Sequence, residues 1–428
     1  MIGTPWGRAD ELGARKLRPG PGTSREQVDR NQRERLFGAM VVAVADNGYE
    51  KTRVADLLRI SGVSRNTFYR HFENKQDCFL ATIDAIVAAD GEIVVRAFHE
   101  TGGDWDQRLA GALEALIGLI VEQPAAARLY YVESYAAGPE ALAKVEAMSD
   151  RLETVAARAV KASPEHAEIP RPLLRAILRG VRRVIQTRLR AGRERDLLEE
   201  GPELLDWALS YKSPPERLNR PRKPPPPPAQ PVTDPHDKHD RILDAAMELM
   251  AAKGYQSLTI ADIAQASAIS LTTFYAHFQS KDDVVVAALR RGADRVTEAT
   301  APAYRDAPDW AHGVGAGLHV FFAYLMLERP LAQFGGVEAH TGSPLVVEVR
   351  DQLMAAGQEF VAEGYCGHPD VKPIAGEAIG ASIDAMIFDQ VGRRDGDRLY
   401  ELAPTATYLA LVPFVGIDEA CAIANASR

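Results

Sequence analysis

The chain has 428 residues, of which 46% are hydrophobic and 25% charged, so it can build two or more folded cores of ordinary size. Its formal net charge of −9 excludes a generally cationic surface for nucleic acid, although a local basic patch is compatible with it. The three cysteines, Cys78, Cys366 and Cys421, lie far apart in the sequence, which excludes a disulfide-rich secreted scaffold and favours a reduced cytosol.

The beginning of the chain lacks the features of a targeting signal. Residues 1–21 mix charges, glycine and proline without an apolar core segment, so they do not resemble a signal peptide. The longest apolar run, at residues 109–121, is too short to span a bilayer and contains Glu114. We therefore expect a cytoplasmic protein with no membrane partner, whose residues 1–29 form a flexible arm.

Residues 30–77 are predicted to form a small helical domain that ends in a helix-turn-helix. Apolar side chains recur at helical spacing between residues 36 and 44. A short helix ends near Arg59, Gly62 supplies the unhindered backbone of a tight turn, and a second short helix starts at Ser64.

The second helix of this motif carries side chains suited to reading DNA. Phe68 and Phe72 are four residues apart and should face the core. Arg65 and Tyr69, and likewise Asn66 and Arg70, are also four apart and should share the outward face. Arg and Asn form bidentate hydrogen bonds to guanine and adenine edges in the major groove, whereas Tyr, His and Lys suit phosphate oxygens. The candidate DNA-contacting residues are Arg53, Ser64, Arg65, Asn66, Thr67, Tyr69, Arg70, His71 and Lys75.

Residues 78–211 are predicted to form a larger helical domain with a strongly basic helix near its end. The basic side chains are Arg171, Arg175, Arg179, Arg182, Arg183, Arg188, Arg190, Arg193 and Arg195. One interpretation of this helix is a solvated basic face. The other is pairing with Glu377, Asp384 and Asp389 on the matching helix near the C-terminus.

A proline-rich interval at residues 212–236 divides the chain. It contains ten prolines, five of them consecutive at residues 224–228. Proline is excluded from a helix interior and from a central strand, and a run of prolines favours an extended polyproline II rod. We therefore expect a semi-rigid linker between two folded halves.

The second half of the chain repeats the first. Residues 254–281 align with residues 48–75 at a constant offset of 206, and 12 of the 28 positions are identical. Residues 399–411 match residues 197–209 more weakly, so the repeat extends beyond the helix-turn-helix. The second half is predicted to comprise a helix-turn-helix domain at 237–283 and a helical domain at 284–428, with candidate DNA-contacting residues Thr259, Ser270, Thr272, Thr273, Tyr275, His277 and Lys281.

The second helix-turn-helix differs from the first where bases would be read. Leu271, Thr272 and Ala276 replace two arginines and an asparagine, and Ala268 replaces the turn glycine, which costs up to about 1 kcal/mol if its φ is positive.

The two heads also differ in charge. Residues 24–77 contain ten Lys and Arg against eight Asp and Glu, whereas residues 236–283 contain four against seven. An acidic head gains little from the release of counterions, which supplies much of DNA affinity. Whether the second head contacts DNA is therefore left open.

The sequence favours an all-α, non-enzymatic protein. Neither half has a run of alternating polar and apolar residues long enough for a sheet. Cys366 and His368 are too few ligands for a zinc site, and no phosphate loop, nucleophile elbow or metal-ligand cluster occurs. We therefore expect no catalytic residues, no metal and no cofactor.

Aromatic and histidine side chains are dense in the second helical domain. They are Tyr304, Trp310, His312, His319, Phe321, Phe322, Tyr324, Phe334, Phe360 and Phe388. At helical spacing they serve either as core or as the lining of an apolar effector pocket.

The string SGVSRNTFYRHFENK at residues 61–75, preceded by GYEKTRVADLL, resembles the N-terminal signature of the TetR family of transcription regulators. The resemblance covers roughly 50 residues per copy, so the chain looks like two TetR-type subunits fused in tandem. It implies a three-helix DNA-binding head, followed by a divergent helical domain that binds a small effector and dimerises through its last two long helices.

The resemblance implies two partners, double-stranded operator DNA and a small-molecule effector of unknown identity. We expect a repressor that the effector releases from DNA. The linker should favour pairing of the two copies within one chain as a pseudo-dimer, with a further homodimer as an option. The alternative is a small-molecule-binding helical protein in which the second head, or both heads, do not bind DNA.

Overall fold

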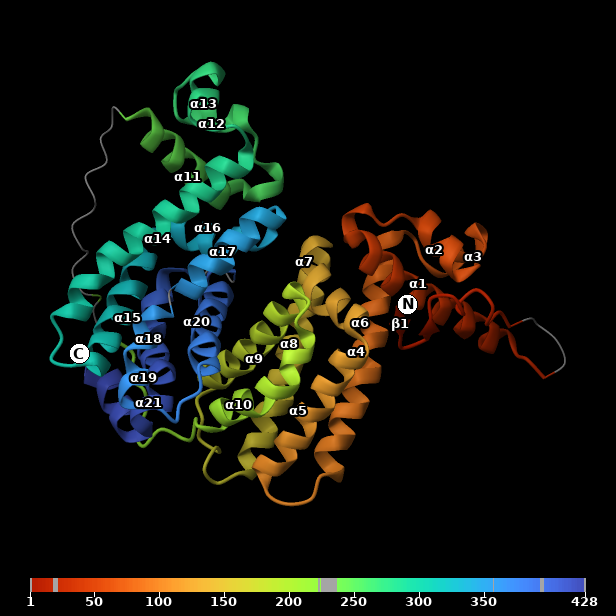
Figure 1. Ribbon diagram of the computed structural model, residues 1–428, viewed down its shortest axis with the longest axis horizontal. Helices are drawn as coiled ribbons and strands as arrows, with labels where there is room; N and C mark the ends of the chain where they lie inside the picture. Colours follow the sequence, from red (N-terminus) through yellow and green to blue (C-terminus); the bar gives the residue numbers. More distant parts are fainter. Residues whose placement is uncertain are drawn as a thin grey trace. The chain divides into compact units, whose positions relative to one another are not determined.

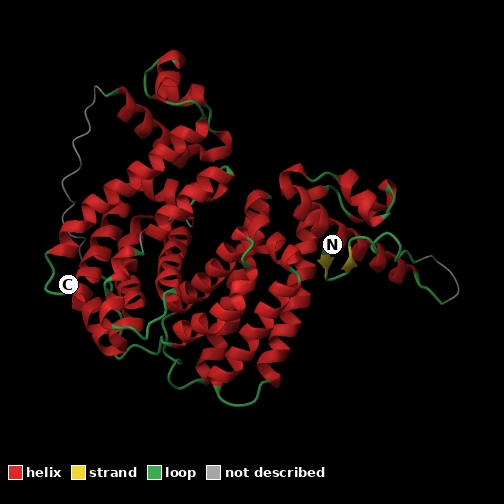
Figure 2. Ribbon diagram, viewed as in Figure 1, coloured by secondary structure: helices red, strands yellow, loops and turns green. Residues whose placement is uncertain are grey.

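The computed structural model of the protein describes residues 2–17, 22–221, 224, 237–356, 358–392 and 396–426. These residues are almost entirely helical, which confirms the predicted all-α class (Figure 2). The strands that occur among them, β1 (Gly3–Thr4) and β2 (Gly7–Arg8), form one short antiparallel hairpin.

The chain folds as two compact units that do not coincide with the two sequence copies. The first unit comprises residues 1–158 and 184–205, and the second comprises residues 159–183 and 206–428. The basic helix α9 (Arg171–Ala191) is therefore divided between the two units. The second unit includes the first 13 residues of α9, and it also includes the chain from residue 206 onward.

The first unit consists of a three-helix head followed by a helical domain (Figure 1). The head contains α1 (Arg25–Lys51), α2 (Val54–Ser61) and α3 (Arg65–His71). The helical domain contains α4 (Lys75–Glu100), α5 (Trp105–Glu122), α6 (Pro124–Arg128), the π-helical turn η1 (Leu129–Glu133), α7 (Ser134–Ala136), α8 (Pro139–Ala159) and most of α10 (Leu197–Leu209).

Short polar signals in the sequence set where α1 begins and bends. Ser24 Oγ accepts the Gln27 N–H at 3.1 Å, and Gln27 Oε1 accepts the Ser24 N–H at 2.8 Å, so the first turn is capped from both sides. Gly48 has φ of 74° and Gly254 has φ of 73°, a conformation that suits glycine. Each glycine bends its helix at that position.

The expectation of a flexible N-terminal arm is wrong for residues 2–17. The Leu12 side chain is fully buried against Gly38, and Arg35 Nε donates to the Leu12 carbonyl oxygen at 3.0 Å. The Trp6 and Phe37 rings pack with centroids 5.2 Å apart. Single apolar residues carry this docking, so the segment shows no periodic apolar pattern that could have revealed it.

The second unit repeats the same order of elements (Figure 1). Its head contains α11 (Lys238–Ser257), α12 (Ile260–Ala266) and α13 (Leu271–His277). Its helical domain contains α14 (Lys281–Arg305), α15 (Trp310–Leu327), α16 (Arg329–Gly336), η4 (Glu338–Thr341), α17 (Pro344–Ala356), α18 (Glu359–Ala362), α19 (Gly364–Gly367), α20 (Ile374–Gly392), η5 (Gly396–Leu402) and α21 (Ala403–Ala426).

The predicted linker is shorter than the proline pattern indicated. The Lys212 carbonyl oxygen accepts from Tyr408 Oη at 3.2 Å, and the Asn219 N–H donates to Asn425 Oδ1 at 2.8 Å. Residues 212–219 therefore lie along α21. The backbone N–H and C=O groups between the prolines form the hydrogen bonds to this helix. The proline-rich residues 225–236 lie outside the described part of the chain.

Two described segments are long and apolar enough to cross a membrane by length and composition. They are α15 and residues 396–426, and 56% of the apolar window in each is buried. A third candidate combines α5 with residues 124–136 across a bend of 101°. In α15 and α21 much of this apolar surface is covered by neighbouring helices, because side chains such as Phe322 and Leu411 are fully buried.

Candidate functional site

The first head holds α3 so that one of its faces stays in solvent. Ser64 caps the helix, because its Oγ accepts the Thr67 N–H at 3.2 Å. Gly62 has φ of 63° and makes the preceding turn, while the Phe68 ring is fully buried and anchors the inner face. The outer face is therefore presented by the fold itself, with α3 held at both its start and its inner side.

Arg65, Asn66 and Tyr69 lie on this outer face, as the sequence predicted. All three are exposed, and the Tyr69 side chain keeps 49% of its surface accessible. The Arg65 guanidinium lies 6.0 Å from the centre of the Tyr69 ring, so the two side chains form one patch. Their role in reading DNA remains a prediction.

Arg70 and His71 hold α3 against α1 instead of joining the outer patch. Arg70 donates to Asp29 Oδ1 at 3.0 Å and to Gln32 Oε1 at 2.8 Å, and His71 Nε2 lies 2.9 Å from the same Gln32 oxygen. Burial, reinforced by the charge of Arg70, lowers the pKa of His71. Both side chains thus have partners in the head, a feature that sequence spacing does not reveal.

Lys75 and Lys281 each contact the end of the first helix of their own head, and their contact with phosphate stays a prediction. Lys75 Nζ donates to the Tyr49 carbonyl oxygen at 2.8 Å and lies 4.0 Å from the centre of the Tyr49 ring. Lys281 Nζ makes the same contacts with Tyr255, at 3.0 Å and 3.9 Å.

Helices α2 and α12 are capped differently at their N-termini. In the first head, the Arg53 N–H donates to Asp56 Oδ2 at 3.0 Å while the Arg53 side chain is exposed. In the second head, Thr259 Oγ1 also accepts the Asp262 N–H at 3.1 Å, which completes a capping box. The exposed Arg53 is therefore available to a phosphate, whereas Thr259 is engaged with its own helix.

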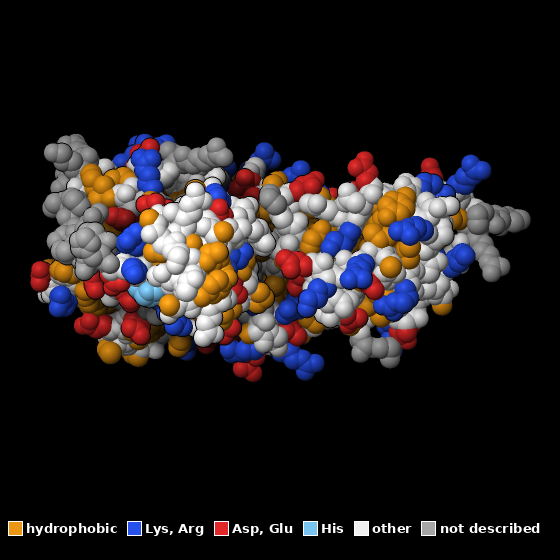
Figure 3. Space-filling model, turned by 90° about the horizontal axis from the view of Figure 1, so that it is seen from above, with side chains coloured by type: hydrophobic (Ala, Val, Ile, Leu, Met, Phe, Trp, Pro, Cys, Tyr) orange, Lys and Arg blue, Asp and Glu red, His pale blue; other side chains and the backbone are white. Residues whose placement is uncertain are grey.

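The second head builds the same scaffold with a different outer face. Ser270 Oγ accepts the Thr273 N–H at 3.1 Å, and the Phe274 ring is fully buried. Leu271 and Tyr275 keep 50% and 55% of their surface accessible. Figure 3 shows this surface as mostly hydrophobic and uncharged, whereas several Lys and Arg side chains lie over the first head.

Ala268, which aligns with the turn glycine of the first head, adopts a positive φ of 53°. An alanine in this region is strained by up to about 1 kcal/mol. The Arg241 guanidinium donates to the Ala268 carbonyl oxygen at 3.3 Å and to that of Ser267, so an arginine from α11 supports the strained turn.

The acidity of the second head is offset by helix α14. Arg291 lies 2.9 Å from Asp240 Oδ1, and Arg295 lies 3.0 Å from Asp244 Oδ1. Both arginines fall outside residues 236–283, over which the charges were counted. The sequence count therefore overstates how strongly this head repels DNA.

Each head is attached to its helical domain through a glutamate. Glu133 Oε2 of η1 accepts the Tyr49 N–H at 2.9 Å in the first unit. In the second unit, Glu338 of η4 packs against Gly254, where an added Cβ would lie 2.7 Å from Glu338 Oε2. Gln256 Nε2 also donates to the Thr341 carbonyl oxygen at 3.4 Å. These contacts join η1 and η4 to the adjacent heads.

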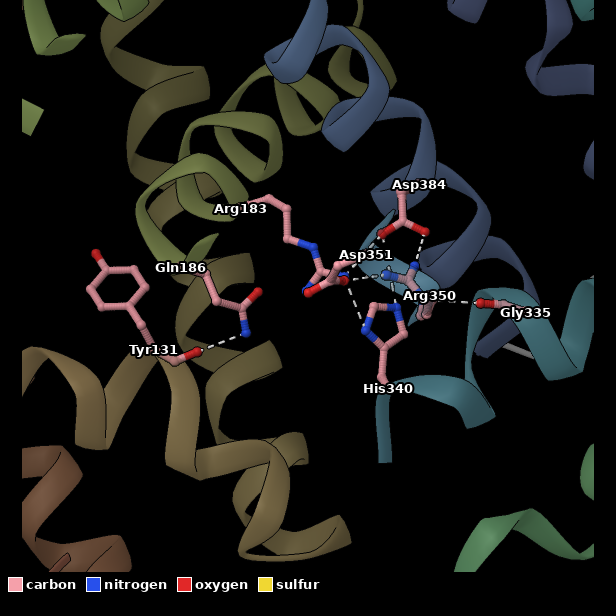
Figure 4. A network of polar contacts seen from close by, with 8 residues as sticks. All are labelled: Tyr131, Arg183, Gln186, Gly335, His340, Arg350, Asp351 and Asp384. Carbon is pink, nitrogen blue, oxygen red and sulfur yellow. Dashed lines mark hydrogen bonds and ion pairs between the residues drawn. The ribbon is translucent and has the colours of Figure 1, made fainter. Parts of the chain in front are cut away.

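A buried group of charged side chains links α9, η4, α17 and α20 (Figure 4). Arg350 of α17 is 1% exposed, bonds to Asp384 of α20, and donates to the Gly335 carbonyl oxygen at 3.1 Å. Arg183 of α9 lies 3.2 Å from Asp384 Oδ2 and 3.1 Å from Nδ1 of His340 in η4. Because Arg183 can only donate, the Nδ1 atom of His340 accepts.

Further ion pairs follow along the same half of α9. Arg179 lies 3.4 Å from Asp389 Oδ1, and Arg175 lies 3.7 Å from Asp389 Oδ2. These contacts confirm the predicted pairing of the basic helix with Asp384 and Asp389. Tyr211, from the segment after α10, is fully buried and donates to the Leu409 carbonyl oxygen at 2.8 Å.

The other half of α9 makes its contacts in the first unit. Gln186 Nε2 donates to the Tyr131 carbonyl oxygen at 2.9 Å (Figure 4), and Arg188 Nε lies 2.7 Å from Glu200 Oε2. The arginines of the basic helix thus divide between two sets of partners, and the interpretation as a solvated basic face does not fit these positions.

Phe322, Tyr324 and Phe334 are buried in the core of the second helical domain, and His319 is a polar residue that is also buried. The Phe322 and Phe334 rings are fully buried, while His319 Nδ1 lies 3.2 Å from Tyr400 Oη. His319 Nε2 and Thr407 Oγ1 have no hydrogen-bond partner among the described residues. Buried polar atoms of this kind are costly unless a water or a ligand satisfies them.

His319 should make the second unit sensitive to acid. Burial lowers the pKa of His319 from 6.5 to about 4, so the unfolded chain takes up a proton that the folded chain refuses. Stability should therefore fall as pH drops from about 6.5 to about 4. His319→Gln should flatten this part of a plot of melting temperature against pH, whereas His277→Gln, at an exposed site, should not. An unchanged slope in His319→Gln would contradict the assignment.

The two heads each match a model of a known protein family. Residues 41–82 and 242–288 each match the family model for bacterial regulatory proteins, tetR family. The HTH-type transcriptional activator FasR of Mycolicibacterium smegmatis is 28% identical over 138 residues, which cover 30% of this chain and 61% of FasR.

Solved structures of similar fold match less than half of the chain. The fatty acid degradation regulator FadR of Bacillus halodurans is 21% identical, with a TM-score of 0.38, over 42% of this chain and 97% of that protein. FadR of Bacillus subtilis, solved in complex with stearoyl-CoA, is 18% identical, with a TM-score of 0.37, over 42% of this chain and 99% of that protein.

Proposed function

We propose that this chain, whose two heads are helix-turn-helix domains of the TetR family, is a sequence-specific DNA-binding regulator of transcription in the cytoplasm. The observation that carries the proposal is the outer face of α3, where Arg65, Asn66 and Tyr69 are exposed while the helix is capped and anchored. Arginine and asparagine at such positions can form bidentate hydrogen bonds to guanine and adenine in the major groove.

The two copies pair within one chain in this proposal. It is supported by the ion pairs of Arg179 and Arg183 with Asp389 and Asp384, because the basic and acidic helices come from different copies. A self-complementary dimer would place identical surfaces against each other, whereas a fused pair can diverge into a basic side and an acidic side. One chain would then supply two heads to one operator, and a further homodimer would use other surfaces.

A small-molecule effector acts as the switch in this proposal. The unsatisfied His319 Nε2 and Thr407 Oγ1 atoms give the second helical domain polar groups that a mainly apolar ligand could satisfy. The contacts of Glu133 and Glu338 give a route from the helical domains to the heads. A ligand that favours one position of η1 or η4 would shift the heads away from the spacing that DNA needs, as in a repressor.

A specific observation favours the alternative for the second head. Its outer face exposes Leu271 and lacks the arginine and asparagine of the first head, so it could be a domain that binds no DNA. The first head is unaffected by this alternative.

Footprinting with the full chain at physiological salt tests the proposed function. The chain should protect two half-sites, and Tyr69→Ala should weaken binding more than tenfold, because a hydrogen bond to a charged phosphate is worth about 1.5–3 kcal/mol. Tyr275→Ala, the matched change in the second head, should cost less. Equal losses would mean that the heads read equivalent half-sites, and the absence of any sequence-specific footprint would refute the proposal.

A further inference from the structure

The two recognition helices have the same backbone geometry. Ser64 has φ of −70° and ψ of 154°, and Ser270 has φ of −78° and ψ of 155°. Each serine caps its helix, and the phenylalanine four residues later is fully buried in both heads. Equivalent positions of α3 and α13 therefore face solvent in the same way within their own heads, and their chemistry can be compared position by position.

The outer face of α13 is apolar where that of α3 donates hydrogen bonds. Leu271 stands where the first head has Arg65, Thr272 where it has Asn66, and both residues of the second head are exposed. Tyr275, also exposed, lies four residues after Leu271, on the same side of α13. An aliphatic side chain cannot hydrogen-bond to guanine or adenine, but it can pack on the C5-methyl group of thymine.

The rest of the second head remains compatible with DNA. Tyr275 keeps 55% of its surface accessible at the position of Tyr69 in the first head. Asp240 and Asp244 are paired with arginines of α14, and Asp262 lies 3.2 Å from Lys253, so several acidic groups are neutralised locally. The exposed apolar surface is limited to a few side chains on one short helix, and the major groove admits an α-helix.

We infer that the second head reads a thymine C5-methyl group through Leu271, so that the operator consists of two chemically different half-sites. The first half-site is read by the hydrogen bonds of Arg65 and Asn66, and the second by apolar contact with thymine-rich sequence. The inference rests on the proposed function, because it requires both heads to contact DNA. Tethering keeps the second head at high local concentration, so weak apolar contacts are sufficient once the first head is bound.

Replacing thymine by uracil in a synthetic operator tests this inference directly. Uracil pairs with adenine as thymine does and lacks only the C5-methyl group. The operator is first selected from random DNA with the full chain, and each half-site is assigned to a head by footprints of the Tyr69→Ala and Tyr275→Ala variants. Uracil in the second head's half-site should weaken binding by about fourfold per contacted methyl group, whereas uracil in the first half-site should have little effect.

Leu271→Ala and Arg65→Ala form a matched pair of variants at equivalent positions. Leu271→Ala should weaken binding to the thymine operator and remove the sensitivity of the second half-site to uracil. Arg65→Ala should weaken binding by about 5- to 150-fold and leave that sensitivity unchanged. Both side chains are exposed, so the melting temperature of each variant should match that of the parent chain.

The possible outcomes separate the inference from the proposed function. Protection of two half-sites with no effect of uracil in the second would overturn the inference and leave the proposed function intact. Protection of one half-site, with no effect of Tyr275→Ala, would also overturn it and would favour a protein partner for α13. The absence of any specific footprint would overturn the proposed function itself.

Discussion

Replacing Asp384 by asparagine should lower the free energy of unfolding of the second unit by about 3–5 kcal/mol. Asp384 is 6% exposed and lies between two arginines, Arg350 and Arg183, which it bonds through different carboxylate oxygens. An asparagine of the same size would remove the negative charge and leave the guanidinium groups with a buried excess of positive charge. Breaking one member of a buried charge group is costly because the remaining charges stay desolvated.

Denaturant unfolding of the full chain measures this effect, and Asp397→Asn provides the control. Asp397 pairs with Arg329, but its side chain is 65% exposed, so its ion pair should contribute less than about 1 kcal/mol. Equal losses of unfolding free energy in the two variants would show that the buried charge group stabilises the protein no more than an exposed ion pair does.

Gly180→Ala should destabilise the second unit by about 1–3 kcal/mol, although alanine is the better helix former. A Cβ on Gly180 would overlap the Ser382 hydroxyl group and lie 2.9 Å from the Ala378 carbonyl oxygen of α20. Ser382 Oγ already donates to that carbonyl oxygen at 2.7 Å, so neither group can move away without losing a hydrogen bond. Helices α9 and α20 would have to separate, and the adjacent ion pairs would lengthen.

Gly118→Ala is the matched control for this change. Gly118 lies inside α5, and no atom lies within 4 Å of a Cβ built there, so the substitution should stabilise the chain by up to about 1 kcal/mol. Light scattering completes the test: the parent chain should have the mass of one chain, 46.7 kDa, if the copies pair internally. A stable dimer that pairs α9 of one chain with α20 of another, or a Gly180→Ala variant as stable as Gly118→Ala, would argue against internal pairing.

Local signals in the sequence were sufficient to predict the heads. Ser64 and Ser270 cap their helices, and the phenylalanines lie inward, because these features depend on spacing of three or four residues within one helix. The pairing of the basic helix with Asp384 and Asp389 was also predictable, since complementary charge ran along two helices that the repeat made equivalent.

Features that depend on a tertiary partner could not be predicted from the sequence. The partner of Lys75 is a backbone carbonyl of Tyr49, 26 residues away, and Arg70 is held by Asp29 across the head. Arg350 is likewise placed by tertiary partners, Asp384 and the Gly335 carbonyl oxygen. Its one signal is its spacing of four residues from the fully buried Val346, which places an arginine on an apolar helix face.

The division of α9 between the two units bears on how this protein can be taken apart. A cut in the proline-rich stretch would separate the two sequence copies. The piece that starts at residue 237 would then lack Arg183 and Tyr211, which belong to the second unit. Each unit combines two separate stretches of the sequence. A part of this protein that is to be expressed or exchanged by itself must therefore be chosen from the three-dimensional structure and not from the sequence repeat.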